Sequence, residues 1–169
     1  AVITKENTEH LEGALKKKTV TSGCGQGTMY GNVMKQLEDY QVPQVPLKQS
    51  EIYAALEALT HYNDTYKKAG AVHGCAVCKG NEVLSFVEDV GRHNALDKLI
   101  GYSISKNLIN PSNQFIACSG RLNFELVQKG IMANIGVMAG VGAPTSLAID
   151  LAKRFDMTLL GFVKENGFN

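Results

Sequence analysis

Apolar residues recur along most of this chain with two spacings, one typical of helices and one typical of strands. From residue 50 to 68 they form a single helical stripe, with Ser50 as a candidate N-cap and Gly70 as the stop. The two apolar runs that follow, residues 71–77 and 82–88, are separated by Cys-Lys-Gly-Asn, whose Gly-Asn pair is typical of a tight turn. This stretch predicts a helix followed by an antiparallel hairpin.

The rest of the chain alternates segments with strand spacing and segments with helix spacing. The expected elements are a helix from about Asn94 to Lys106, a strand over 114–118, a helix from Phe124 to Ile131, a strand over 135–139, a helix capped by Thr145 and a last strand over 157–163. Because strands that alternate with helices usually run parallel, this order predicts an α/β fold with a mostly parallel mixed sheet flanked by helices.

The composition is that of an ordinary globular protein, with 44% apolar and 20% charged residues among 169. Seventeen lysines and arginines against sixteen acidic residues leave a net charge of +1, so no broad basic field points to nucleic acid as a partner. No apolar run is long enough to cross a bilayer, and the start of the chain lacks the apolar core of a signal peptide. We therefore expect no membrane association and a cytoplasmic location, where the four cysteines would not form a disulfide framework.

The first 49 residues are patterned more weakly than the rest. Two prolines indicate an extended linker, and closely spaced glycines indicate a loop around Cys24. We therefore expect a flexible N-terminal segment over residues 1–49 that carries the Cys24 loop, and an α/β domain over residues 50–169. A start without methionine indicates a processed chain or a piece of a longer one, and we favour the piece.

Ionisable side chains crowd into residues 88–98, at the junction of a predicted strand and a predicted helix. In α/β sheets such junctions are where ligands bind, so Arg92 and His93 are candidates for a site. In the ordinary alternative, Asp89 caps the helix, the guanidinium pairs with Glu88 and the imidazole is solvated. This segment alone leaves both interpretations open.

Cys24 stands among glycines in Thr-Ser-Gly-Cys-Gly-Gln-Gly, without a bulky neighbour to shield its thiol. A sulfur nucleophile that serves a partner protein needs such access, whereas a structural cysteine normally stands among apolar side chains. The alternative is a flexible loop with an incidental thiol.

His73, Cys75 and Cys78 have a spacing that suits a metal ion, and a Cys-x-x-Cys pair also suits a redox couple. A structural zinc would need further ligands from elsewhere in the chain. On a strand, Cys75 and Cys78 would point to opposite faces, so two core cysteines are a competing interpretation.

Two further strand-to-helix junctions carry Ser119-Gly120-Arg121 and Thr145-Ser146. Free amide groups, hydroxyls and a guanidinium are typical of a phosphate-binding cradle. Ordinary helix capping by Ser119 and Thr145 is the alternative. Parallel strands would bring these junctions to one edge of the sheet, which favours a shared site.

Three segments, in this order and separation, resemble the FdhD family of formate dehydrogenase accessory sulfurtransferases: residues 88–98, residues 119–121 with 124–127, and residues 143–148. The resemblance runs from about Thr21 to Phe162. It implies a three-layer, cytidine-deaminase-like α/β domain that forms a homodimer. Family members also carry an N-terminal β-rich part, which we expect to be missing from this chain.

The resemblance also implies the activity. It implies transfer of sulfur from a cysteine desulfurase to the molybdenum or tungsten bis-molybdopterin guanine dinucleotide cofactor of formate dehydrogenase, with Cys24 carrying the sulfur as a persulfide. The cofactor would be a bound substrate, and a guanine nucleotide would mimic part of it. The residues expected to contact the cofactor are Ser119, Gly120, Arg121, Thr145, Ser146, Phe162, Val163, Lys164, Glu165, Asn166 and Gly167, with Arg92 and His93 near the transferred sulfur.

Two positions depart from the family pattern. Gly27 stands where the family's loop often has a second cysteine, which leaves Cys24 as a lone persulfide carrier or gives Cys75 and Cys78 a helping role. Lys164 stands where an arginine is usual, so a bidentate phosphate contact would become a single point charge.

Two other functions fit parts of the pattern. A zinc-dependent, deaminase-like hydrolase would use His73, Cys75 and Cys78, but the glutamate that such enzymes place near the histidine is missing, so we expect no bound metal. A non-catalytic cofactor chaperone would use the same binding residues as a sulfurtransferase. Such a chaperone would tolerate alanine in place of Cys24.

Overall fold

The computed structural model of the protein describes residues 33–164 and 167–169. The chain divides by its internal contacts into two compact units, residues 1–39 and residues 40–169. The first unit contributes a short helical segment over residues 33–37. The second unit contains the sheet and the helices that cover it.

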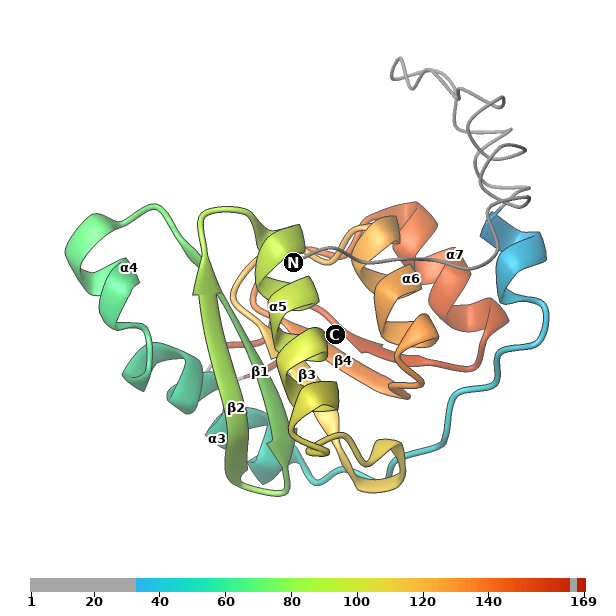
Figure 1. Ribbon diagram of the computed structural model, residues 1–169, viewed down its shortest axis with the longest axis horizontal. Coiled ribbons are helices and arrows are strands. Elements are labelled where there is room, and N and C mark those ends of the chain that lie inside the picture. The colour runs from blue at the N-terminus through green and yellow to red at the C-terminus, as the bar shows by residue number, and fades with distance from the viewer. Residues whose placement is uncertain (1–32, 165–166) are drawn as a thin grey trace, which may run out of the picture. The chain divides into compact units, whose positions relative to one another are not determined.

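Five strands form one mixed sheet. They are β1 (His73–Lys79), β2 (Glu82–Asp89), β3 (Phe115–Cys118), β4 (Val137–Gly140) and β5 (Thr158–Leu160). Their spatial order is β2-β1-β3-β4-β5 (Figure 1). Strand β1 is antiparallel to both of its neighbours, whereas β3, β4 and β5 run parallel to one another. The mixed sheet is confirmed, but two of its four strand pairs are parallel and not most of them, because β1 is antiparallel to β3 as well as to its hairpin partner β2.

Helices cover both faces of the sheet. They are α3 (Gln49–His61), α4 (Asp64–Ala69), α5 (Arg92–Ser105), α6 (Phe124–Met132) and α7 (Ser146–Arg154), with a 3-10 turn at Pro111–Asn113. Helix α3 packs on β1, β2 and β3, and its Ala55 and Leu59 join Ala76 and Ala117 of the sheet in one buried apolar cluster. The neighbouring helices α5, α6 and α7 cover the opposite face (Figure 1). The predicted three layers are therefore present, and within the described residues no helix has the length and apolar character to cross a bilayer.

The helical stripe over residues 50–68 forms α3 and α4, not the single helix expected from the sequence. The cause lies on β2, where the Glu88 carboxylate accepts hydrogen bonds from the backbone N–H groups of Thr65 and Tyr66, each 3.0 Å long. These bonds satisfy free N–H groups in the first turn of α4 and so favour a second helix start. Gly70 ends α4 with a φ of 69°, which confirms it as the predicted stop.

Other element boundaries differ from expectation by a few residues. Helix α3 starts before Ser50, because Lys48 is its N-cap and donates its backbone N–H to the Glu51 carboxylate over 2.6 Å. Strand β1 includes Cys78, so the hairpin turn consists of the Gly-Asn pair alone, with Gly80 at a φ of 56°. Strand β5 has three residues and is shorter than the apolar run that predicted it.

Candidate functional site

Ends of all five strands meet at one edge of the sheet. Strand β2 ends where Asp89 pairs with His73 at the start of β1, and β3, β4 and β5 end at the same edge. The register places Cys118, the last residue of β3, opposite Cys75 on β1 and beside Gly140 on β4. The three strand-to-helix junctions singled out in the sequence therefore lie along one edge, as predicted.

Three loops leave this edge and are joined through their backbones. We call them the edge loops: residues 119–123 after β3, 141–145 after β4 and 161–164 after β5. The N–H of Gly142 donates to the carbonyl of Gly120, and the N–H of Phe162 donates to the carbonyl of Gly142, both over 3.3 Å. A Cβ added at Gly142 would lie 2.8 Å from both N and Cα of Arg121, so the first two loops are in backbone contact.

Ser119 and Thr145 have different roles in these loops. Thr145 caps α7, since its side-chain oxygen accepts the N–H of Ala148 over 3.3 Å, which confirms the capping interpretation for this residue. Ser119 does not cap α6, because Asn123 occupies the N-cap position. The Ser119 hydroxyl accepts the N–H of Gly74 over 2.9 Å and so holds the first edge loop against the start of β1.

Arg92 starts α5 close to the first edge loop, where a Cβ added at Gly120 would lie 3.1 Å from Nδ1 of His73 and 3.8 Å from Cβ of Arg92. The Nε atom of Arg92 is buried and has no hydrogen-bond partner among the described residues. The alternative pairing with Glu88 is wrong, because that carboxylate caps α4. A buried donor of a charged group is costly unless something accepts its hydrogen bond, so this position favours an anionic ligand near the start of α5.

His93 lies in an open groove between α5 and α6. Its Nε2 atom is 3.3 Å from Nδ2 of Asn123 and 3.4 Å from the Glu125 carboxylate, and its side chain is 33% exposed. The groove is also lined by Asp97, Gln128, Lys129 and Met132. Desolvation is the main cause that lowers the pKa of His93 below its usual value, although the Glu125 carboxylate raises it. The imidazole is therefore neutral at pH 7 and is held by side chains of the first edge loop and α6, not simply solvated.

The lowered pKa of His93 predicts how the free energy of unfolding depends on pH. Between the folded pKa and the unfolded value of about 6.5, the unfolded chain binds more protons, so stability rises with pH and falls on acidification. We expect His93→Gln to lose less free energy of unfolding than the wild type when pH falls from 7.5 to 5.5, measured by urea denaturation. The difference should be small because the side chain is partly exposed.

Glu125→Gln is the control for this prediction, because it removes the carboxylate that favours the charged imidazole. It should make the loss of stability on acidification larger than in the wild type. Equal pH dependence in the wild type and both variants would contradict the proposed environment of His93.

The cysteines of β1 occupy the core. Cys78 packs with the apolar cluster under α3, and burial raises the pKa of its thiol to about 12. Cys75 donates to Cys118, with 3.4 Å between their Sγ atoms, and both side chains are buried. Within the described residues, no group of three or more metal-ligating side chains is assembled, so His73, Cys75 and Cys78 do not come together as a zinc site would require. The core interpretation of Cys75 and Cys78 is confirmed.

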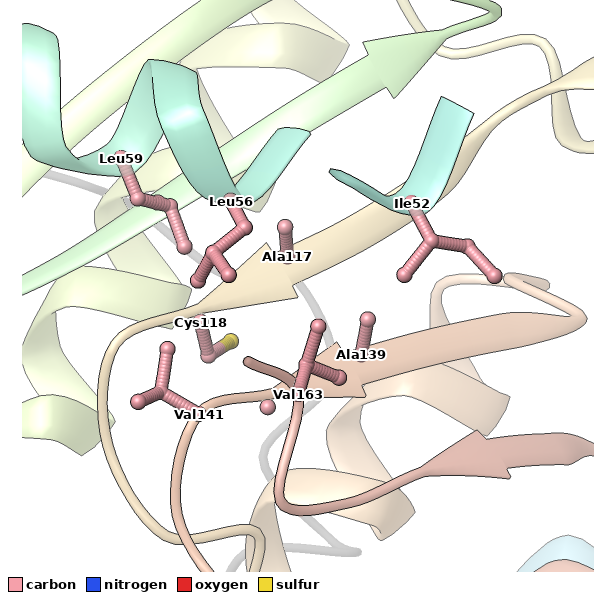
Figure 2. A pocket seen from close by; sticks show the side chains of 9 residues that line it. Ile52, Leu56, Leu59, Ala117, Cys118, Ala139, Val141 and Val163 are labelled. Carbon is pink, nitrogen blue, oxygen red and sulfur yellow. The ribbon is translucent and has the colours of Figure 1, made fainter. Parts of the chain in front are cut away.

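The last edge loop presents residues of different exposure. Phe162 has a φ of 54° and is 46% exposed, and Lys164 is exposed. Val163 is only 2% exposed and lines a small apolar cavity under α3, where Figure 2 shows it with Leu56 and Cys118. Gly167 is held to Lys164 by backbone bonds of 2.9 and 3.3 Å. The other residues expected in the site, Cys24, Glu165 and Asn166, lie outside the described residues.

The sequence patterns did not predict two features of the site. One is the pairing of Cys75 with Cys118, and the other is the position of His73 beside Gly120. Both depend on the register between β1 and β3, which no local spacing reveals. The apolar run that ends at Cys118 was the only available signal, because it predicted a strand end near the site.

Comparison with known proteins connects this chain to one family. The model of the FdhD/NarQ family matches residues 1–169. The sulfur carrier protein FdhD of Sulfurisphaera tokodaii is 43% identical over 119 residues, which are 70% of this chain and 47% of that protein. The sulfur carrier protein FdhD of Saccharolobus solfataricus is 37% identical over 148 residues, which are 86% of this chain and 55% of that protein. The chain thus spans about half the length of the curated relatives it matches.

A solved structure agrees with this assignment. The crystal structure of a protein from Desulfotalea psychrophila, described as a formate dehydrogenase accessory protein, matches with a TM-score of 0.73 and 29% sequence identity. The match covers 80% of this chain and 58% of that one. By sequence and by fold, the chain belongs to the FdhD/NarQ family.

Proposed function

We propose that this chain is a sulfur carrier that takes sulfur from a cysteine desulfurase as a persulfide on Cys24. It delivers this sulfur, as a homodimer in the cytoplasm, to the bis-molybdopterin guanine dinucleotide cofactor of formate dehydrogenase. The proposal is supported by membership of the FdhD/NarQ family and by relatives that are named sulfur carrier proteins. The cofactor, with its molybdenum or tungsten, is the substrate in this proposal and not a resident group.

The observation that carries the proposal is the buried Nε of Arg92, which has no hydrogen-bond partner in the part of the chain that the structure describes, on a residue whose Cβ lies close to the first edge loop. A guanine dinucleotide cofactor carries pyrophosphate groups, and a guanidinium is the side chain best suited to donate paired hydrogen bonds to their oxygens. Arg121 and Lys164 add exposed positive charge to the first and last edge loops. The Ser146 N–H at the start of α7 is a further donor for a phosphate oxygen.

The loading step follows from thiol chemistry. The Cys24 thiolate attacks the outer sulfur of the desulfurase persulfide and forms a new sulfur–sulfur bond. The original sulfur–sulfur bond of the donor breaks, and the donor cysteine leaves as a thiolate. Cys24 then holds the sulfur as a persulfide. Arg92 and His93 stand at the edge where the sulfur would be handed to the bound cofactor, and Arg92 supplies the positive charge there, since His93 is neutral at pH 7.

Incubation of the purified chain with a cysteine desulfurase and free cysteine tests this step. Intact mass and peptide mapping should show one added sulfur atom, located on Cys24, that dithiothreitol removes. A Cys78→Ser variant should load equally well, because burial holds that thiol protonated and away from a partner protein. Loading of a Cys24→Ser variant, together with loss of loading in Cys75→Ser, would show that the carrier has been assigned to the wrong residue.

A further inference from the structure

Two buried thiols that the sulfur-transfer proposal does not use face each other across β1 and β3. The Sγ atoms of Cys75 and Cys118 are 3.4 Å apart, and the two residues are 1% and 2% exposed. They are direct register partners, and the N–H of Ser119 donates to the carbonyl of Gly74 on their outer side. That hydrogen bond makes Cys75 and Cys118 a non-hydrogen-bonded pair, the kind in which opposed side chains come closest.

This geometry suits a cross-strand disulfide. The Cα atoms of a non-hydrogen-bonded antiparallel pair lie about 4.5 Å apart, inside the range of roughly 4.4 to 6.8 Å that disulfides span. The two sulfur atoms need only a further small approach to reach bonding distance. Cys78, by contrast, packs in the cluster under α3 and has no cysteine as a register partner, so it offers no such bond.

Cys118 also lies beside a small cavity at the end of the sheet. Cys118 is one of the residues that line the apolar cavity between α3 and the strand ends, together with Leu56, Val141 and Val163 (Figure 2). The cavity has about 10 Å³ of free volume, which is close to the room that one water molecule needs. Packing at this end of β3 is therefore not complete, and Cys118 is the last residue of its strand, next to the first edge loop.

We propose that Cys75 and Cys118 form a redox pair that hydrogen peroxide converts to a cross-strand disulfide. One thiol attacks peroxide and becomes a sulfenic acid while one water leaves. The second thiol then attacks the sulfenic sulfur, a sulfur–sulfur bond forms and a second water leaves. The pair loses two electrons and two protons in total, and a small dithiol reductant returns both thiols.

The disulfide would act on the candidate site directly. It would link β1 to β3 immediately below Ser119, the first residue of the edge loops, whose hydroxyl and N–H already bind Gly74. Oxidation would thus fix the start of the first edge loop against β1. The hydrogen bond from Cys75 and burial raise the pKa of Cys118, which predicts slow oxidation at neutral pH that speeds up as pH rises.

The experiment uses the full chain with Cys24→Ser, so that the proposed sulfur-carrying thiol is absent. After treatment with hydrogen peroxide, acid quenching, denaturation and alkylation, peptide mapping should show Cys75 linked to Cys118 and Cys78 alkylated. Because the bond closes a long loop, the melting midpoint should rise by roughly 5–10 °C and return to the reduced value after dithiothreitol. A Cys118→Ser variant should show neither the link nor the rise.

Recovery of both Cys75 and Cys118 in alkylated form, or a link that involves Cys78, would overturn the proposal. The link is mapped in the Cys24→Ser parent itself, so the decision does not depend on whether Cys118→Ser folds. Neither sulfur loading nor cofactor transfer enters the measurement. The experiment therefore tests the proposed redox pair independently of the proposed sulfur-carrier function.

Discussion

Replacement of Cys24 by alanine is expected to reduce the activation of formate dehydrogenase to background. The persulfide can form only on a sulfur that reaches the donor cysteine of another protein, and the glycines around Cys24 leave its thiol unshielded in the sequence. The measurement is formate-dependent dye reduction in extracts of cells that lack their own family member and receive this chain. Activity equal to that of the wild-type chain would favour a cofactor chaperone, which needs no thiol at this position.

Cys78→Ala is the matched control for the loss at Cys24. It also removes a thiol group, but one in the buried cluster under α3, where burial raises the pKa to about 12 and keeps the thiol protonated. We expect a moderate loss of stability from the small cavity, roughly 1 kcal/mol, and near-normal activation of formate dehydrogenase. If the two alanine variants lost activity equally at equal expression, the specific role of Cys24 would be contradicted.

Local sequence signals were sufficient for three caps and turns, but not for the start of α3, which lies before the predicted N-cap Ser50. Thr145 caps α7 as predicted, Gly70 ends α4 in the left-handed conformation, and Gly80 turns the hairpin. Each of these depends on the conformational preference of one residue and the groups within one turn of it. The edge at which the junctions meet could also be predicted, because the carboxyl ends of parallel strands must share an edge.

Contacts between distant segments account for what the sequence did not show. The break between α3 and α4 depends on Glu88, more than twenty residues away along the chain, so the stripe of apolar positions continues across it. The same carboxylate was the alternative partner of Arg92, and its use as a cap leaves the Arg92 Nε without a partner among the described residues. A single long-range contact therefore changed both a helix boundary and the interpretation of the site.

Gly142→Ala is expected to weaken guanine nucleotide binding by roughly tenfold or more, which corresponds to about 1.4 kcal/mol. The added Cβ would lie 2.8 Å from the backbone N and Cα of Arg121, so the second edge loop must move away from the first. That movement would strain the hydrogen bond from the Gly142 N–H to Gly120 and displace the cradle beside Arg92. Titration calorimetry with GDP, as a partial mimic of the cofactor, measures the change.

Two further readouts separate this effect from unfolding. Overpacking should cost about 1–3 kcal/mol, which a domain of ordinary stability survives, so sulfur loading on Cys24 should persist in Gly142→Ala. Gly101→Ala is the control, since a Cβ added at Gly101 on α5 has no neighbouring atom within 4 Å. This substitution should stabilise the helix by about 0.5–1 kcal/mol and leave the nucleotide affinity unchanged. Normal GDP affinity in a destabilised Gly142→Ala would mean that the contact between the first two edge loops supports the fold and not the ligand. Lost affinity with retained loading would place cofactor binding at the edge loops and separate it from the thiol that carries sulfur.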